Sequence, residues 1–294
     1  MTHFSGSYVA IVTPWNNDAT AIDFGALKEL IEFHAAAGTD GIVIPGTTGE
    51  SATLTHPEQN ELVRRVVEMV AGRMKVVAGA GSNSTAEAVL LAKAGKAAGA
   101  DGLMVITPYY NRPTPEGLVR HFRAVGEATD LPIMAYNVPS RTGTNMLPPT
   151  VARIRKEVPT VVSLKEASGS VDQSSQILEI SDIEIISGDD SLALPLMAVG
   201  AKGVVSVAAN VMPTEIKKMV SAAQAGDYKT AREWHYKLLP LMRAVFFETN
   251  PGPAKAALRM MGRGNGVLRL PLCEMLPENE SKLREVLKGY GLVR

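Results

Sequence analysis

The chain has 294 residues and carries 30 Lys and Arg against 30 Asp and Glu, so its formal net charge is zero. This balance argues against the basic stripe of a nucleic-acid-binding protein and the polybasic segment of a membrane-surface protein. The longest apolar runs have only the length of a strand, and residues 1–7 have neither the basic start nor the apolar core of a signal peptide. Because the single cysteine, Cys273, allows no disulfide within the chain, we expect a cytoplasmic protein.

Short β-branched apolar runs alternate with Ala-rich amphipathic segments as far as about residue 225. Strands this apolar, without alternating polar residues, are buried on both faces, as in parallel sheets. Eight βα units in about this length predict a (β/α)8 TIM barrel, with a doubly wound sheet as the alternative. The predicted strands are residues 8–13, 41–45, 75–79, 102–106, 132–137, 161–165, 184–187 and 203–207.

The doubly wound alternative usually carries a nucleotide-binding fingerprint, and the nearest approach to one lies at residues 79–84. Ser84 stands where the third glycine would be required, so we do not expect dinucleotide binding. Ser84 and Glu87 instead predict a capping box that opens a helix, and Thr55 and Glu58 predict a second one.

From about residue 226 the pattern changes to helical periodicity over residues 228–247, 253–261 and 280–288, without any strand-like run. We therefore divide the chain into a barrel, residues 1–225, and a three-helix C-terminal extension, residues 226–294. No low-complexity linker separates the two parts, which predicts one compact unit. The added helices are expected to bury their apolar faces in a subunit interface or on the barrel flank.

Lys165 is the most informative residue for chemistry, because it closes the apolar run 161–164 at the mouth of a predicted buried strand. Desolvation there disfavours the charged amine, lowers its pKa and leaves a group that can attack a carbonyl. Tyr136 ends the preceding strand in the same way. Two such strand ends in series predict an active site; the alternative is a solvated lysine paired with Glu166 and a core tyrosine.

Other strand ends carry polar groups that suit a keto-acid site. The Gly-Thr-Thr-Gly turn at residues 46–49 places two hydroxyls beside free backbone N–H groups, which suits a carboxylate, although it also fits a simple tight turn. Arg141, just past Tyr136, predicts a carboxylate clamp, or else a surface cation. Tyr109 and Tyr110 follow the fourth strand and could pack on a partner. An amine, a phenol, hydroxyls and an arginine together predict Schiff-base chemistry on an α-keto acid.

Two further side-chain types favour structural roles. Cys273 lies in an apolar segment punctuated by proline, with no histidine nearby to act as a base, so we expect a buried structural thiol. The five histidines show no metal-ligand spacing, and no metal site is expected.

Five motifs in order resemble the dihydrodipicolinate synthase (4-hydroxy-tetrahydrodipicolinate synthase) family, within the superfamily of Schiff-base aldolases that includes N-acetylneuraminate lyase. The resemblance extends over essentially the whole chain. N-acetylneuraminate lyase and the 2-keto-3-deoxy sugar-acid aldolases share the lysine and the tyrosine, but the double threonine and the Ser-Arg-Thr-Gly turn favour the synthase. The motifs are GTTGES at 46–51, YYNRP at 109–113, YNVPSRTG at 136–143, KEASG at 165–169 and SGDD at 187–190.

The resemblance implies that Lys165 forms an imine with pyruvate, with no other cofactor. The derived enamine would attack the aldehyde of L-aspartate 4-semialdehyde, and cyclisation of the adduct would free the lysine. A different class of function is a catalytically silent barrel that binds pyruvate or an amino acid as a sensor. Retention of Lys165 and Tyr136 argues against that class.

The same resemblance implies roles for the remaining motif residues. Tyr136 would donate and accept protons, with Thr47 and Tyr110 completing a hydroxyl relay, and in the family this second tyrosine comes from the neighbouring subunit. A homotetramer built as a dimer of dimers is therefore expected. The substrate-binding positions implied are Thr48, the backbone of Val205, Arg141 for the carboxylate of the semialdehyde, and Gly188.

Many family members are inhibited by L-lysine at the dimer interface. The matching positions in this chain are His56, Asn83, Glu87 and Tyr109, which offer a carboxylate and polar partners to a bound amino acid. Gln59 stands where some inhibited members carry histidine, so inhibition and its absence both remain open.

Overall fold

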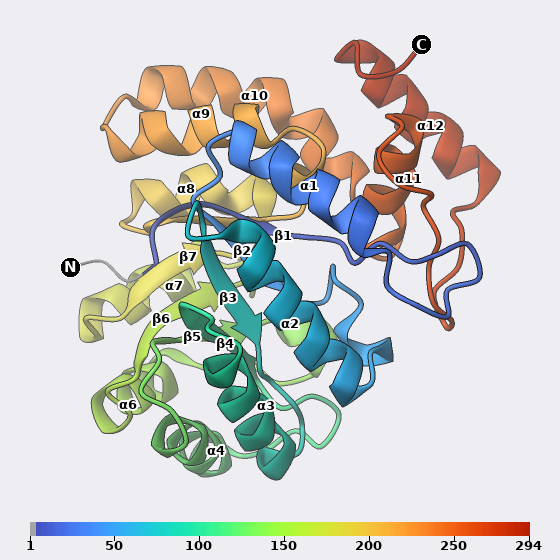
Figure 1. The fold of residues 1–294 in the computed structure, drawn as a ribbon. Coiled ribbons are helices and arrows are strands. Elements are labelled where there is room, and N and C mark those ends of the chain that lie inside the picture. Colours follow the sequence, from blue (N-terminus) through green and yellow to red (C-terminus); the bar gives the residue numbers. More distant parts are fainter. Residues whose placement is uncertain (1–3) are drawn as a thin grey trace.

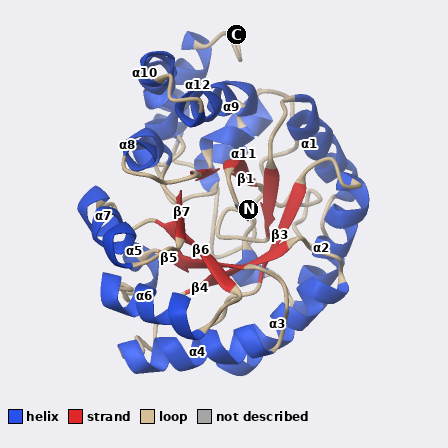
Figure 2. Ribbon diagram, turned by 90° about the vertical axis from the view of Figure 1, so that its left-hand side faces the viewer, coloured by secondary structure: helices blue, strands red, loops and turns tan. Residues whose placement is uncertain are grey.

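The computed structural model describes residues 4–294; residues 1–3, where the segment examined for a signal peptide begins, lie outside the described residues. Eight parallel strands pair in chain order, and β1 pairs with β8 to close the barrel, which confirms the TIM-barrel prediction. The helices surround the strands in Figure 2. The strands are β1 (Gly6–Ala10), β2 (Gly41–Ile44), β3 (Lys75–Gly79), β4 (Gly102–Ile106), β5 (Ile133–Asn137), β6 (Val161–Glu166), β7 (Glu184–Ser187) and β8 (Gly203–Ser206).

The helices of the barrel follow the strands in alternation and form its outer layer (Figure 1). Three short 3-10 turns, η1 (Ser51–Thr53), η2 (Asp190–Leu192) and η3 (Ala208–Asn210), lie in the loops after β2, β7 and β8. The helices are α1 (Phe24–Ala36), α2 (His56–Val70), α3 (Thr85–Ala97), α4 (Pro115–Glu127), α5 (Pro139–Thr142), α6 (Pro148–Glu157), α7 (Val171–Ile180), α8 (Ala193–Ala198) and α9 (Pro213–Gln224).

The largest difference from the predicted strands concerns β1, which was expected at residues 8–13 but occupies Gly6–Ala10. Residues 12 and 13 leave the ladder because side chains and loops take their hydrogen bonds. The Val12 N–H donates to Asn210 Oδ1 at 3.2 Å, and the Thr13 hydroxyl donates to the Gly49 carbonyl at 2.7 Å. At the other end the barrel closes tightly, since a Cβ on Gly203 would lie 2.0 Å from the Gly6 carbonyl oxygen.

One of the two predicted capping boxes is complete. At the start of α2, Thr55 Oγ1 accepts from the Glu58 N–H and the Glu58 carboxylate accepts from the Thr55 N–H. The second prediction was half wrong: Ser84 caps α3, but the Glu87 carboxylate accepts from the Ser82 hydroxyl at 2.7 Å. The Ser84 N–H turns instead to the Ser82 hydroxyl, so Ser82 replaces the backbone partner that Glu87 was expected to bind.

Apolar side chains fill both the space between strands and helices and the interior of the barrel. Layers of inward-facing side chains make such a barrel a packed core rather than a pore. The polar groups at the carboxyl ends of the strands therefore lie above a packed apolar interior. The buried interior cluster consists of Phe4, Tyr8, Ala10, Val43, Val77, Met104, Met134, Tyr136, Val138, Val162, Ala167, Ile186 and Val205.

Three more helices follow the barrel: α10 (Tyr228–Ala244), α11 (Gly252–Met260) and α12 (Pro277–Gly289). In Figure 1 α10 lies alongside α9, and α12 lies beside α11 at the far side of the molecule. α10 packs on α9, so the C-terminal helices are in contact with the barrel part. This contact does not test the division of the chain at residue 226, which stays a prediction.

The prediction of a buried Cys273 was wrong, because this thiol is exposed. Its segment runs over the surface between α11 and α12, where the neighbouring Leu270 is 82% exposed. Among the described residues, no helix has the length and apolar character needed to cross a bilayer.

Candidate active site at the carboxyl end of the barrel

Lys165 is the penultimate residue of β6, lies inside the barrel and is only 5% exposed. It lies opposite Tyr136 of β5 in the parallel register, and its Nζ is 4.1 Å from the centroid of the tyrosine ring. Burial lowers the pKa of Lys165 to about 8, an effect that the Asp189 and Asp190 carboxylates oppose. Roughly a tenth of such an amine is neutral at pH 7, against a few parts in ten thousand for an ordinary lysine. The side chain is therefore poised to act as a nucleophile.

The alternative pairing of Lys165 with Glu166 does not occur. Successive side chains of a strand point to opposite faces, and the Glu166 carboxylate lies outside the barrel, where it accepts from Asn137 Nδ2 and the Ser168 N–H. Glu166 thus fixes the loop that follows β6, and among residues 4–294 no ion pair joins its carboxylate to the Lys165 amine.

Tyr136 is buried beside this amine. Burial raises the pKa of Tyr136 to about 12, while the Arg141 charge and the neighbouring Thr47 hydroxyl act in the opposite direction. A phenol in this setting is protonated at neutral pH and has a hydroxyl partner with which to exchange a proton. Arg141 belongs to the short helix α5 directly after β5, which brings its guanidinium to the same end of the barrel.

Two carboxylates after β7 lie near enough to the Lys165 amine to act on its charge. Asp190 is buried and accepts from the Ser206 hydroxyl, from the Val207 N–H at 3.0 Å and from the Ala208 N–H at 3.1 Å, so it ties η2 to the end of β8. Burial raises the pKa of Asp189, and the Lys165 charge opposes that shift. The pair supplies negative potential that favours a cation, ammonium or iminium, at the Lys165 nitrogen. Sequence reasoning placed both residues at a strand end but did not predict the anchoring of Asp190.

Gly188 leaves room for the Lys165 side chain. A Cβ built on Gly188 would lie 3.2 Å from Lys165 Cε and 2.7 Å from the Ala167 Cβ, both closer than ordinary side-chain contacts. Val205 lies in β8 and is fully buried in the barrel interior.

Thr48 is held by a residue that the sequence did not suggest. Asn250, in the loop before α11, donates from Nδ2 to Thr48 Oγ1 at 3.0 Å, and both residues are buried. The two residues are 202 positions apart, so no local pattern could have connected them.

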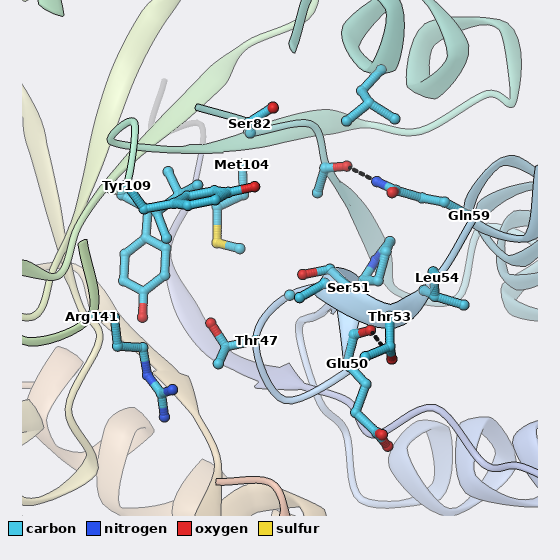
Figure 3. A pocket seen from close by; sticks show the side chains of 18 of the residues that line it. Thr47, Glu50, Ser51, Thr53, Leu54, Gln59, Ser82, Met104, Tyr109 and Arg141 are labelled. Carbon is cyan, nitrogen blue, oxygen red and sulfur yellow. Dashed lines mark hydrogen bonds between the residues drawn. The ribbon is translucent and has the colours of Figure 1, made fainter. Parts of the chain in front are cut away.

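A cavity of about 500 Å³ opens beside this cluster and is lined by Thr47, Tyr136 and Arg141. In Figure 3 Thr47 and Arg141 lie on one side of the cavity, with Ser82 and Gln59 on the other. The more deeply buried Lys165, Thr48 and Val205 do not line it, and neither does Gly188. The cavity therefore lies next to the Lys165 amine rather than around it.

The positions matched to a lysine inhibitor are only partly gathered. His56, Glu87 and Tyr109 line the cavity, but Asn83 does not; its backbone carbonyl accepts from Asn111 Nδ2 at 2.9 Å. Gln59 is buried and donates to the Gly79 carbonyl at 2.8 Å (Figure 3).

Tyr110 does not join Thr47 and Tyr136 within this chain. It is 90% exposed, and it does not line the cavity. Its φ of +72°, on the loop after β4, is an uncommon backbone conformation for a bulky residue.

Within residues 4–294, no group of three or more His, Cys, Asp or Glu side chains is arranged to hold a metal ion. The chemistry available to the cluster is that of an amine, a phenol, hydroxyls and carboxylates.

Residues 3–290 match the Dihydrodipicolinate synthetase family. The chain is 50% identical over 294 residues to a 4-hydroxy-tetrahydrodipicolinate synthase of Persephonella marina, covering 99% of this chain and 100% of the relative. A crystal structure of dihydrodipicolinate synthase from Aquifex aeolicus has a TM-score of 0.96 at 49% identity, covering 98% of this chain and 99% of that one. The enzyme from Cyanidioschyzon merolae, crystallised with lysine bound, has a TM-score of 0.96 at 42% identity, with 100% of both chains covered.

Proposed function

The chain belongs to the dihydrodipicolinate synthetase family, and from this we infer that it condenses pyruvate with L-aspartate 4-semialdehyde to give 4-hydroxy-tetrahydrodipicolinate. The observation that carries the chemistry is the buried Lys165 amine, whose pKa burial lowers to about 8, set against the Tyr136 ring. A desolvated amine beside a proton-exchanging phenol is the arrangement that imine formation requires. No cofactor is needed beyond the covalent imine between the lysine and pyruvate.

In this proposal the neutral Lys165 amine attacks the keto carbon of pyruvate. The resulting carbinolamine loses water to give an iminium, with Tyr136 transferring the protons. Loss of a proton from the methyl carbon gives an enamine, and that carbon forms a bond with the aldehyde carbon of the semialdehyde. The amine of the semialdehyde then attacks the iminium carbon, the ring closes, and the bond to Lys165 breaks to release the free amine.

The proton relay is proposed to run from Tyr136 through Thr47 to Tyr110 of a second copy of the chain. The neighbouring Thr47 hydroxyl acts to lower the pKa of Tyr136, whereas Tyr110 projects from its own subunit and is 90% exposed. A hydroxyl held outward in this way suits a site completed across an interface. We therefore propose that the working form is a homo-oligomer, built as a dimer of dimers, in the cytoplasm.

The substrate carboxylates are assigned to two places. Thr48 and the backbone of Val205 would bind the pyruvate carboxylate near the Lys165 amine, with Gly188 leaving space for the lysine side chain. Arg141 lines the cavity and would bind the carboxylate of the semialdehyde through charge-assisted hydrogen bonds.

Feedback inhibition by L-lysine is a separate proposal for the same cavity. The Glu87 carboxylate, His56 and Tyr109 line it and could bind an ammonium group and polar atoms of an amino acid. A titration with L-lysine at fixed substrate concentrations tests this; unchanged turnover at millimolar lysine would contradict it. Glu87→Gln should weaken any inhibition, because it removes the charge that faces the ammonium.

The proposed function is tested by following product formation with both substrates, coupled to reduction of the product by a nicotinamide-dependent reductase. Turnover should depend on pyruvate and on the semialdehyde. Borohydride added with pyruvate should fix a covalent adduct on the peptide that contains Lys165. An adduct without turnover would keep the Schiff-base chemistry and point to a sugar-acid aldolase, whereas a modified peptide elsewhere would contradict the assignment.

A further inference from the structure

A buried ion pair links the C-terminal helices to the loop that carries Thr47 and Thr48. Lys255 of α11 lies 2.5 Å from the carboxylate of Glu50, and their side chains are 3% and 0% exposed. Glu50 comes directly after the Gly-Thr-Thr-Gly turn and has a φ of +55°, which is uncommon for a residue other than glycine. A strained backbone conformation of this kind persists only where the surrounding contacts fix it.

Both carboxylate oxygens of Glu50 are occupied. Oε1 accepts from Lys255 and from Trp15 Nε1 at 2.9 Å, and Oε2 accepts from the Arg269 N–H at 3.0 Å. The Lys255 ammonium also donates to the Thr13 carbonyl at 2.8 Å. The pair therefore joins the loops that follow β1 and β2 to α11 and to the segment after α11.

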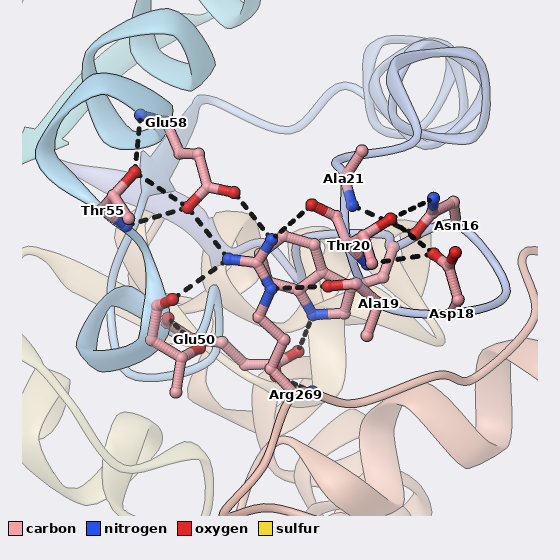
Figure 4. A network of polar contacts seen from close by, with 11 residues as sticks. Asn16, Asp18, Ala19, Thr20, Ala21, Glu50, Thr55, Glu58 and Arg269 are labelled. Carbon is pink, nitrogen blue, oxygen red and sulfur yellow. Dashed lines mark hydrogen bonds and ion pairs between the residues drawn. The ribbon is translucent and has the colours of Figure 1, made fainter.

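The Arg269 side chain extends this network, as Figure 4 shows. Its guanidinium donates to both oxygens of Glu58 at the start of α2, and it lies 3.8 Å from the centroid of the Trp15 ring. It also donates to the carbonyls of Ala19 and Thr53. The β2–α2 loop is thus fixed from its far side as well.

Asn250 makes the last of these contacts, and the direction of its hydrogen bond determines which role the Thr48 hydroxyl has left. Its Nδ2 donates to Thr48 Oγ1, so the Thr48 hydroxyl is the acceptor in this pair and keeps its own proton for another partner. Asn250 is only 5% exposed, and its Oδ1 has no hydrogen-bond partner among the described residues. A hydroxyl whose lone pair is engaged in this way is ready to donate to a carboxylate.

Stability alone does not explain the ion pair. The cost of removing two charges from water often exceeds their mutual attraction, and apolar replacements of buried pairs are frequently neutral or stabilising. A buried pair that holds a strained loop beside reacting groups has a more specific use, the placement of that loop.

We propose that Asn250 and the Lys255–Glu50 pair are positioning residues for pyruvate binding: they hold the Thr47–Thr48 turn in place and direct the Thr48 hydroxyl toward the pyruvate carboxylate. The proposal rests on the proposed function in that pyruvate is taken as the ligand of Thr48. It assigns to the C-terminal segment a part in substrate binding, in addition to packing against the barrel.

The first test compares Asn250→Ala and Asn250→Asp. Loss of the amide should raise the KM for pyruvate about tenfold, the worth of one hydrogen bond. The carboxylate of Asn250→Asp would accept the Thr48 proton and repel the substrate carboxylate, so its KM should rise further. The KM for the semialdehyde should change by less than about threefold. Wild-type pyruvate KM values in both variants would overturn the proposal.

The second test separates placement from stability. Lys255→Met leaves the Glu50 charge buried and unpaired, and should lower the melting temperature and raise the pyruvate KM. The double variant Glu50→Gln/Lys255→Met removes both charges, so stability should recover in part while the pyruvate KM stays high. Recovery is incomplete because the single amide oxygen cannot accept from both Trp15 Nε1 and the Arg269 N–H. Recovery of both together would contradict a positioning role. Lys217→Met is the matched control, because it removes the Lys217–Asp40 pair, 2.6 Å apart, and should leave the pyruvate KM unchanged.

These readouts remain separate from the proposed function. Pyruvate affinity is also measured without the second substrate, from the pyruvate concentration that gives half-maximal borohydride-trapped adduct. If the wild-type protein forms the adduct but no product with the semialdehyde, the condensation proposal fails and the Asn250 comparison still decides this one. If Lys255→Met does not fold, the Asn250 variants carry the test.

Discussion

The pH dependence of imine formation is the most direct consequence of the buried Lys165. Burial lowers its pKa to about 8, the nearby Asp189 and Asp190 oppose that shift, and Arg141 adds to it. Only the neutral amine attacks pyruvate, so the rate should rise as pH increases and level off above the pKa. From pH 6 to 8 the neutral fraction of such an amine rises about 50-fold, and it then rises less than about twofold more.

An ordinary lysine gives a different profile. Its neutral fraction still rises roughly 70-fold between pH 8 and 10, so the two cases separate clearly in that interval. The assay is the initial rate of adduct formation at saturating pyruvate, stopped with borohydride at short times and read by mass spectrometry of the intact protein. A rate that keeps climbing tenfold per unit through pH 9.5 would refute the reasoning.

Asp189→Asn sharpens the test. Removal of this carboxylate takes away one of the charges that raise the Lys165 pKa, so the inflection should move below that of the wild-type protein. Asp172→Asn is the matched control, because Asp172 is an exposed residue of α7 whose carboxylate accepts a hydrogen bond from Gln176 Nε2. An unchanged inflection in Asp189→Asn would show that the carboxylate does not act on the amine.

Three other outcomes are expected. Tyr110→Phe should lower turnover tens-fold or more, since general acid–base help is worth roughly 10²–10⁴. If the tyrosine acts across an interface, co-expression of Tyr110→Phe with Lys165→Ala should restore some activity in mixed oligomers. No restoration would show that Tyr110 does not act across an interface. Gly188→Ala should slow adduct formation roughly 10²-fold because its Cβ would displace the Lys165 stem, and a wild-type rate would contradict that crowding. Burial lowers the pKa of His121 from 6.5 to about 4. As the pH falls, the unfolded chain therefore binds the proton before the folded protein does, and as much as about 3 kcal/mol of unfolding free energy should be lost between pH 6.5 and 4. Urea unfolding should show a smaller loss for His121→Gln than for the wild-type protein, and an equal loss would contradict this.

The strands and the barrel follow directly from the sequence because the information is local. Runs such as residues 102–106 are apolar without alternation, which only a strand buried on both faces requires, and β4 occupies those residues. Errors arose where a local pattern competes with a distant partner. Residues 12 and 13 are as apolar or β-branched as the rest of β1, yet they leave the ladder for Asn210 and Gly49. Cys273 sits in an apolar segment that nevertheless runs over the surface.

The reacting groups at the strand ends could be predicted, whereas the groups that hold them could not. Lys165 and Tyr136 lie at the carboxyl ends of consecutive strands, one residue before the last, and the parallel pairing of these strands brings them together. Lys255 meets Glu50 across 205 residues, and nothing in the helical periodicity of α11 shows which loop above the barrel its lysine will reach. The helical periodicity is itself misleading, because a lysine in such a pattern predicts an exposed position, whereas Lys255 is buried. Lys255 lies within the fully buried run of α11, and its charge is paired only because the loop after β2 supplies the Glu50 carboxylate. Glu50 in turn has its left-handed conformation at the position where α11 supplies the ammonium. Neither segment specifies the arrangement alone, so the pair is a property of the closed fold.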